Sequence, residues 1–163
     1  YDNLFDNTTI TKVAAGSFTH DYNAYVTNSN RLSPNGSHGL ILTNNPIYQT
    51  SYLGRYYYPT NGGLLSRLLD AGSRYATNAT LYHFTATTNQ VKEGSSKVDI
   101  GFHFVAADTS GNPLDTDSDG LADYLEDANG NGTVGSGETD WQSASDFGLG
   151  VRITKPRSGT ILP

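Results

Sequence analysis

The sequence has no cysteine and no methionine among its 163 residues, and it has only one tryptophan. The absence of cysteine excludes disulfide bonds, thiolate metal sites and thiol nucleophiles. No apolar run approaches the roughly 18 residues that a membrane-spanning helix requires, so we expect no membrane insertion. Because no initiator methionine is present, we expect that the chain either begins after processing or is a segment of a longer protein.

Basic residues are missing from one long part of the chain. Residues 108–146 contain ten carboxylates and neither lysine nor arginine, within a sequence of 16 acids, 10 bases and a net charge of −6. The rest of the chain therefore has six acids against ten bases, a charge of about +4. No basic cluster of the kind that follows phosphates is present, which argues against a nucleic-acid partner. The local excess of acid predicts a local function.

The remaining composition favours strands and turns. Eleven tyrosines and six phenylalanines accompany abundant Thr, Asn and Gly, a mixture typical of β-proteins. Apolar and polar residues alternate, as in half-buried strands, at 3–13, 39–43, 81–88 and 97–106. We therefore predict a mainly β body over residues 1–112, arranged as an antiparallel β-sandwich. The opening NLFDNTTI also resembles a rung of the parallel β-helices of secreted proteins, so a cap of such a helix is the alternative.

One short helix is expected inside the body, in LLSRLLDAG at residues 64–72. Its four leucines fall on one face, which predicts core packing rather than a docking surface. Asn61 is a candidate cap before this helix, and Gly72 is a candidate stop after it.

Residues 115–126, DTDSDGLADYLE, match the twelve-residue loop of an EF-hand, D-x-[DN]-x-[DN]-G-x5-E. Calcium takes six to eight hard oxygen ligands, and alternate side chains of a tight turn converge on one point while glycine at position 6 permits the turn. The predicted ligands at positions 1, 3, 5, 7, 9 and 12 are Asp115, Asp117, Asp119, the backbone oxygen of Leu121, Asp123 and Glu126.

The count begins again at the next residue, in DANGNGTVGSGE at 127–138. The predicted ligands of this second loop are Asp127, Asn129, Asn131, the backbone oxygen of Thr133, and Glu138. Gly135 stands at position 9, where a water molecule can take the place of a side chain. The second loop has two carboxylates against five in the first, so we expect it to bind calcium more weakly. We thus predict two Ca²⁺ sites.

The two loops abut without a long helix between them, and in this the segment 113–141 resembles the thrombospondin type 3 repeats of secreted proteins. The phrase DGLADYLEDANGNGTVGSGETDW is also similar to the tails of large secreted repeat proteins of bacteria. The resemblance implies a calcium-organised, structural segment that joins a β-rich domain to a sandwich domain, in an extracellular or cell-surface protein.

The C-terminal part, residues 142–163, contains GLGVRITKPRSGTILP, which resembles the first strand of a bacterial immunoglobulin-like domain. Such a strand either folds back on its own sheet, is the start of a longer protein, or adds to the sheet edge of a neighbouring copy. The last option predicts a calcium-stabilised extracellular fibre or surface assembly whose subunits join head to tail.

Two other functions compete with the fibre, namely a carbohydrate-binding or spacer module and an accessory domain of a secreted hydrolase. Tyr56, Tyr57 and Tyr58 in GRYYYP could form an aromatic platform for surface glycans, which would make the chain a carbohydrate-binding or spacer module of a larger secreted protein. Four histidines, His20, His38, His83 and His103, lack any motif spacing, and no nucleophile elbow or phosphate loop is present. We therefore expect no enzyme activity, and we expect His83 and His103 to be packed and hydrogen-bonded on neighbouring strands.

Overall fold

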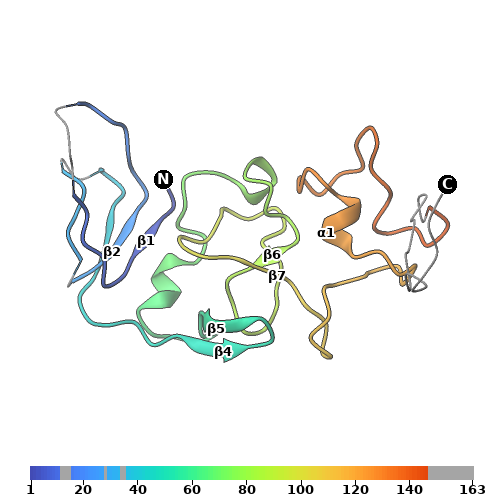
Figure 1. The fold of residues 1–163 in the computed structure, drawn as a ribbon, viewed down its shortest axis with the longest axis horizontal. Coiled ribbons are helices and arrows are strands. Elements are labelled where there is room, and N and C mark those ends of the chain that lie inside the picture. Colours follow the sequence, from blue (N-terminus) through green and yellow to red (C-terminus); the bar gives the residue numbers. More distant parts are fainter. Residues whose placement is uncertain (12–15, 28, 34–35, 147–163) are drawn as a thin grey trace, which may run out of the picture.

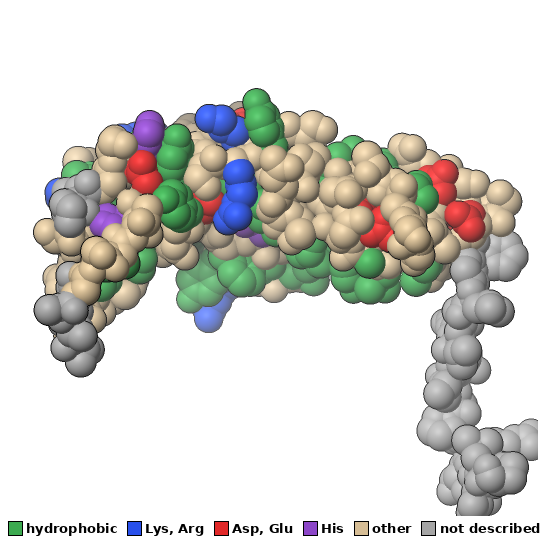
Figure 2. All heavy atoms as spheres, turned by 90° about the horizontal axis from the view of Figure 1, so that it is seen from above, with side chains coloured by type: hydrophobic (Ala, Val, Ile, Leu, Met, Phe, Trp, Pro, Cys, Tyr) green, Lys and Arg blue, Asp and Glu red, His purple; other side chains and the backbone are tan. Residues whose placement is uncertain are grey.

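The computed structural model describes residues 1–11, 16–27, 29–33 and 36–146. The molecule is elongated, with a small sheet near the N-terminus, two short antiparallel strand pairs in the middle and the acidic segment at the other end (Figure 1). In the space-filling view that acidic end shows no lysine or arginine, which agrees with the charge segregation of the sequence (Figure 2). Within the described residues, no helix is long and apolar enough to cross a membrane.

The N-terminal sheet is parallel. Its strands are β1 (Leu4–Phe5), β2 (Ala24–Val26) and β3 (Leu40–Leu42), in the order β1-β2-β3. Both pairs run in the same direction and in register, so that Leu4, Ala24 and Leu40 lie side by side. All three residues of β2 are buried, because a strand flanked on both sides is the most enclosed.

Two antiparallel pairs form the middle of the molecule. β4 (Gln49–Ser51) pairs with β5 (Gly54–Tyr57), and β6 (Phe84–Thr85) pairs with β7 (Phe104–Val105). The described strands thus form three small open sheets, which confirms a mainly β chain but not the predicted antiparallel sandwich. The predicted strands are also longer than the observed ones, since turns and irregular backbone take up most of the body.

The predicted helix over 64–72 is a short 3₁₀ helix, η1 (Leu65–Leu68). Leu69 is already extended, and Asn61 does not act as a cap because Leu64 occupies that position without a side-chain bond. A second 3₁₀ turn, η2 (Ala76–Asn78), comes next along the chain. As predicted, the leucines of η1 pack in the core. The buried core cluster is Ala24, Val26, Leu42, Tyr58, Leu65, Leu68, Ala86 and Ile100.

Candidate metal centre

Residues 115–121 form a tight turn in which side chains fold back onto the backbone. The N–H of Gly120 donates to Asp115 Oδ2 at 3.1 Å, that of Asp119 to Asp117 Oδ1 at 3.2 Å, and that of Leu121 to Asp119 Oδ1 at 2.8 Å. Gly120 has a φ of 97°, a conformation that glycine adopts without strain. The turn therefore holds three carboxylates on its inner side.

The three aspartates converge. Ligand oxygens of Asp115, Asp117 and Asp119 all lie within 4.8 Å of one another. Each of these residues also has one oxygen that is buried and accepts no hydrogen bond within the described chain, namely Asp115 Oδ1, Asp117 Oδ2 and Asp119 Oδ2. A buried carboxylate oxygen without a partner is costly, so this arrangement favours a compensating positive charge.

Glu126 closes the same loop from the short helix α1 (Asp123–Glu126). Its side chain is almost fully buried, and both of its oxygens lack a hydrogen bond of ordinary geometry among the described residues. Burial raises the pKa of Glu126 to about 7, an effect that the nearby Thr139 hydroxyl partly offsets. The negative charges of Asp117 and Asp119 raise this pKa further, which places Glu126 beside the cluster.

Asp123 was expected as the ligand at position 9, but its carboxylate has other partners. Its two oxygens accept from the backbone N–H of Thr116 at 2.6 Å and from the Thr116 hydroxyl at 2.7 Å. Lys92 Nζ also donates to Asp123 Oδ2 at 3.3 Å. Asp123 therefore fixes the start of the loop and its position on the body, and the structure does not bring it into the aspartate cluster.

The second loop repeats the backbone pattern of the first. Gly132 N–H donates to Asp127 Oδ2 at 2.7 Å, Asn131 N–H to Asn129 Oδ1 at 3.0 Å, and Thr133 N–H to Asn131 Oδ1 at 2.8 Å. These are the same three position pairs, 6 to 1, 5 to 3 and 7 to 5, that the first loop uses. Two loops of different sequence thus adopt one turn.

The oxygens of the second loop are already engaged. Glu138 accepts from the N–H groups of Asn129 at 2.9 Å and Gly135 at 2.7 Å, and Asp127 Oδ1 accepts from Asn131 at 3.1 Å. None of the buried side-chain atoms that lack a partner in the described chain belongs to residues 127–138. The structure brings Asp127, Asn129, Asn131 and Glu138 into one loop, but hydrogen bonds satisfy them.

A buried histidine connects this second loop to the body. The Nε2 atom of His83, a residue beside β6, lies 3.0 Å from Asp127 Oδ2, and both side chains are almost completely buried. Burial, followed by the charge of Lys92, lowers the pKa of His83, while Asp127 and Asp123 act in the opposite direction. A neutral imidazole with its proton on Nε2 suits this geometry, because a carboxylate can only accept.

Trp141 covers the junction from the other side. Its ring contacts His83 edge to face at a centroid distance of 5.1 Å, and Lys92 Nζ lies 4.4 Å from the ring centroid. Gly132 packs so closely on Tyr82 that a Cβ atom there would meet the ring at 2.3 Å. The acidic segment is therefore attached to the body by a packed, buried contact.

A second histidine takes part in a separate acidic cluster. His103 Nε2 lies 2.9 Å from Glu93 Oε1, and Asp99 completes a group whose potential ligand atoms lie within 4.8 Å of one another. Burial and the neighbouring Glu93 raise the pKa of Asp99 to about 7. His83 and His103 are thus hydrogen-bonded beside the paired strands β6 and β7, as predicted.

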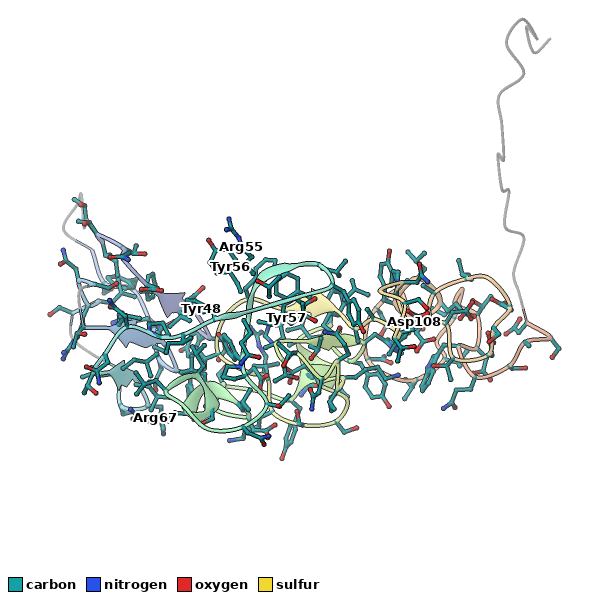
Figure 3. The ribbon with its side chains drawn as sticks, turned by 90° about the horizontal axis from the view of Figure 1, so that it is seen from below. Tyr48, Arg55, Tyr56, Tyr57, Arg67 and Asp108 are labelled. Carbon is teal, nitrogen blue, oxygen red and sulfur yellow. The ribbon has the colours of Figure 1, made fainter. Side chains whose placement is uncertain are left out.

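The aromatic platform that was considered as an alternative is not formed by three exposed tyrosines. Tyr57 and Tyr58 are buried, whereas Tyr56 projects from the body (Figure 3). Tyr57 stacks on Phe104 at 4.0 Å, and the Tyr58 hydroxyl donates to the carbonyl of Ile100 at 2.6 Å. Both faces of the end of β5 are covered, so only Tyr56 remains available to a ligand.

Comparisons with protein families, curated proteins and solved structures gave no match for this chain.

Proposed function

We propose that residues 115–126 bind one Ca²⁺ ion and that this ion neutralises the buried carboxylate oxygens of the loop. Asp115, Asp117, Asp119 and Glu126 would supply carboxylate oxygens, and Leu121 would supply its backbone oxygen. The supporting observation is that, among the described residues, the carboxylates of this set have five buried oxygens that lack a hydrogen bond of ordinary geometry. A hard cation that prefers six to eight oxygen ligands suits these donors.

We further propose a second, weaker Ca²⁺ site in residues 127–138, with Asp127, Asn129, Asn131, the backbone oxygen of Thr133 and Glu138 as its donors. The same three backbone bonds support a common loop conformation in both sites. Binding there must compete with the hydrogen bonds that already engage Asp127 and Glu138, which gives a physical reason for lower affinity.

The function that we propose for the chain is structural, as a subunit of an extracellular, calcium-stabilised fibre or surface assembly. Calcium would hold residues 113–141 rigid, and the buried contact between His83 and Asp127 would attach them to the body. Calcium sites of extracellular modules commonly bind at roughly 10⁻⁴ to 10⁻³ M, which suits an extracellular location. The segment that would join neighbouring copies by strand complementation belongs to residues 142–163, of which 147–163 lie outside the described residues.

Light scattering of the purified chain tests this function, in millimolar calcium and again after chelation, with electron microscopy of the same samples. We expect linear particles in calcium that shorten or disorder after chelation. A variant that lacks residues 148–163 should stay monomeric and folded in calcium. Monomers of the full chain under both conditions would contradict the assembly. This result would not bear on the calcium sites, which the calcium titration tests.

A further inference from the structure

A lysine amine and a buried carboxyl group meet where the acidic segment joins the body. Lys92 Nζ lies 3.3 Å from Asp123 Oδ2, although the two residues are 31 apart in the chain. The side chain of Asp123 is 1% exposed and that of Lys92 is 23% exposed. The contact is therefore largely shielded from solvent, which distinguishes it from an ion pair on the protein surface.

Aromatic rings enclose the amine. Lys92 Nζ lies 4.4 Å from the centroid of the Trp141 ring and 5.5 Å from that of the Tyr82 ring. The Trp141 side chain is itself buried at this junction. The rings hold the amine beside the carboxyl group and limit the access of water, which competes with an amine for the carboxyl carbon.

The imidazole of His83 faces the same amine. Its Nδ1 atom lies 3.5 Å from Lys92 Nζ and 3.7 Å from Asp123 Oδ2. Because Nε2 carries the proton that binds Asp127, Nδ1 presents a lone pair to the lysine. Nδ1 can thus take a proton from the nitrogen and pass it to the oxygen, while Asp127 positions the ring. This is the arrangement of a nucleophile, a base and an orienting carboxylate.

Two donors fix the carboxyl group of Asp123. The backbone N–H of Thr116 donates to Oδ1 at 2.6 Å, and the Thr116 hydroxyl donates to Oδ2 at 2.7 Å. A negative charge that develops on Oδ1 during an attack on the carboxyl carbon therefore meets a fixed backbone donor, as in an oxyanion hole. Oδ2 is the oxygen in contact with Lys92 and His83, and it is the one placed to leave.

We propose that Lys92 and Asp123 form an intramolecular isopeptide bond, with no other co-reactant. The Nζ–Cγ bond forms and the Cγ–Oδ2 bond breaks. Of the three protons of the ammonium group, one passes to Oδ2, a second follows through His83 Nδ1, and the third stays on the amide nitrogen. Oδ2 leaves as water, and the opposite charges of the two side chains disappear together.

Folding supplies the driving force for this condensation. Two reactants that are held in contact reach effective molarities of roughly 10⁵–10⁸ M in favourable cases. The amide is also neutral, so its formation removes the cost of keeping an ion pair largely out of water. The bond would attach the acidic segment to the body covalently, and it depends neither on calcium nor on residues 147–163.

Mass spectrometry of the purified, denatured full chain tests the bond. We expect an intact mass that is lower by one water molecule than the mass calculated from the sequence. Trypsin should not cleave after Lys92 and should release residues 75–97 joined to residues 98–152, because its flanking sites are Arg74, Lys97 and Arg152. A chain of the full calculated mass, with cleavage after Lys92, would leave an ion pair only and would overturn the proposal.

A matched pair of variants assigns the loss of water. Lys92→Arg keeps a positive charge beside Asp123 but lacks the amine, so its mass should equal the calculated value. Lys97→Arg changes an exposed lysine of the same segment and should still lose one water molecule. A loss of water that persists in Lys92→Arg would arise elsewhere, for example by cyclisation at Asp119, and would contradict the assignment.

The role of His83 is measured by the rate at which the bond forms. Protein that is kept unfolded from its synthesis onward starts without the bond, because folding alone brings Lys92 to Asp123. The loss of water after dilution from denaturant is then followed by mass. His83→Gln should slow it about a hundredfold, as expected for the removal of a general base. An unchanged rate in a variant that circular dichroism shows to be folded would contradict the proton transfer through His83.

Discussion

The two acidic loops adopt the same turn but neutralise their charge differently. Both use backbone N–H groups at positions 5, 6 and 7 to hold side chains at positions 3, 1 and 5. Within the part of the chain that the structure describes, residues 115–126 have five buried carboxylate oxygens without a hydrogen bond of ordinary geometry, whereas residues 127–138 have none. In our proposal one loop needs a cation to be stable, and the other is satisfied by His83 and its own backbone.

A third cluster shows a further way to handle buried acid. Asp99 is buried beside Glu93, and its raised pKa, about 7, means that a proton neutralises it over much of the acidic range. In our proposal a cation neutralises the first cluster, whereas hydrogen bonds satisfy the second and a proton neutralises the third. Four substitutions separate these cases, from the largest expected effect to the smallest.

Replacing His83 with alanine should destabilise the protein most. It leaves the carboxylate of Asp127 buried without its histidine partner and opens a cavity beneath Trp141. Removing one member of a buried pair commonly costs about 3–5 kcal/mol. Chemical denaturation should reveal a loss of this order both in calcium and in chelator. A loss confined to calcium would show that His83 acts only through the metal.

Replacing Glu126 with glutamine should change the stability of the protein in opposite directions without and with calcium. In chelator the variant should be more stable than the parent, because a buried carboxylate with a raised pKa is removed. In calcium it should be less stable, since a single site at a hundredfold excess over its dissociation constant contributes about 2.7 kcal/mol. Thermal unfolding under both conditions measures the change of sign. Glu138→Gln, at position 12 of the second loop, is the comparison variant. It removes one of the two oxygens that accept from Asn129 and Gly135, so it should lose stability in chelator as well as in calcium and show no change of sign.

Replacing Asp99 with asparagine should alter the dependence of stability on pH. The folded pKa of about 7 lies above the ordinary carboxyl value of 3.8, so the folded state holds the proton more tightly than the unfolded state. The parent is therefore favoured at low pH, and its stability contribution from Asp99 is lost as pH rises from about 4 through 7. The variant keeps an acceptor for the N–H of Asp70. Denaturation from pH 4 to 8 should show a flatter profile and higher stability at pH 8, by about 1–3 kcal/mol.

Replacing Asn131 with aspartate should make the second loop more like the first. The substituted oxygen can still accept from the N–H and hydroxyl of Thr133, so the turn is kept while a charge is added. More ligand charge raises calcium affinity, and we expect roughly a tenfold gain at this site, or about 1.4 kcal/mol. Titration of the variant in a Glu126→Gln background isolates the second site. An unchanged affinity would place the ion elsewhere.

The sequence predicted the acidic loops more closely than the body around them. Ligand spacing is local, so the convergence of Asp115, Asp117 and Asp119 near Glu126 could be inferred from counting alone. The role of Asp123 could not, because it depends on two donors of Thr116 that compete with a metal for its oxygens. The attachment through His83 involves residues 44 apart in the chain, and no spacing rule finds it.

The parallel sheet was anticipated only by the alternative prediction, the resemblance of NLFDNTTI to a rung of a parallel β-helix. Its strands are two or three residues long, and their partners lie in distant turns, so alternation in the sequence suggested longer antiparallel strands. The repeated triplet Asn-Leu-Phe and Asn-Ala-Tyr was the available signal for in-register parallel stacking. Alternation along a half-buried strand predicts that only one of Tyr57 and Tyr58 is buried. Both are buried because Phe104 covers Tyr57 and the segment at Ile100 covers Tyr58.

The central claim is that residues 115–126 need a cation, and a calorimetric calcium titration of the parent beside Glu126→Gln tests it most directly. We predict two binding events of unequal affinity in the parent, and only the weaker one in the variant. Identical isotherms for the two proteins, or no heat of binding in the parent, would contradict the account.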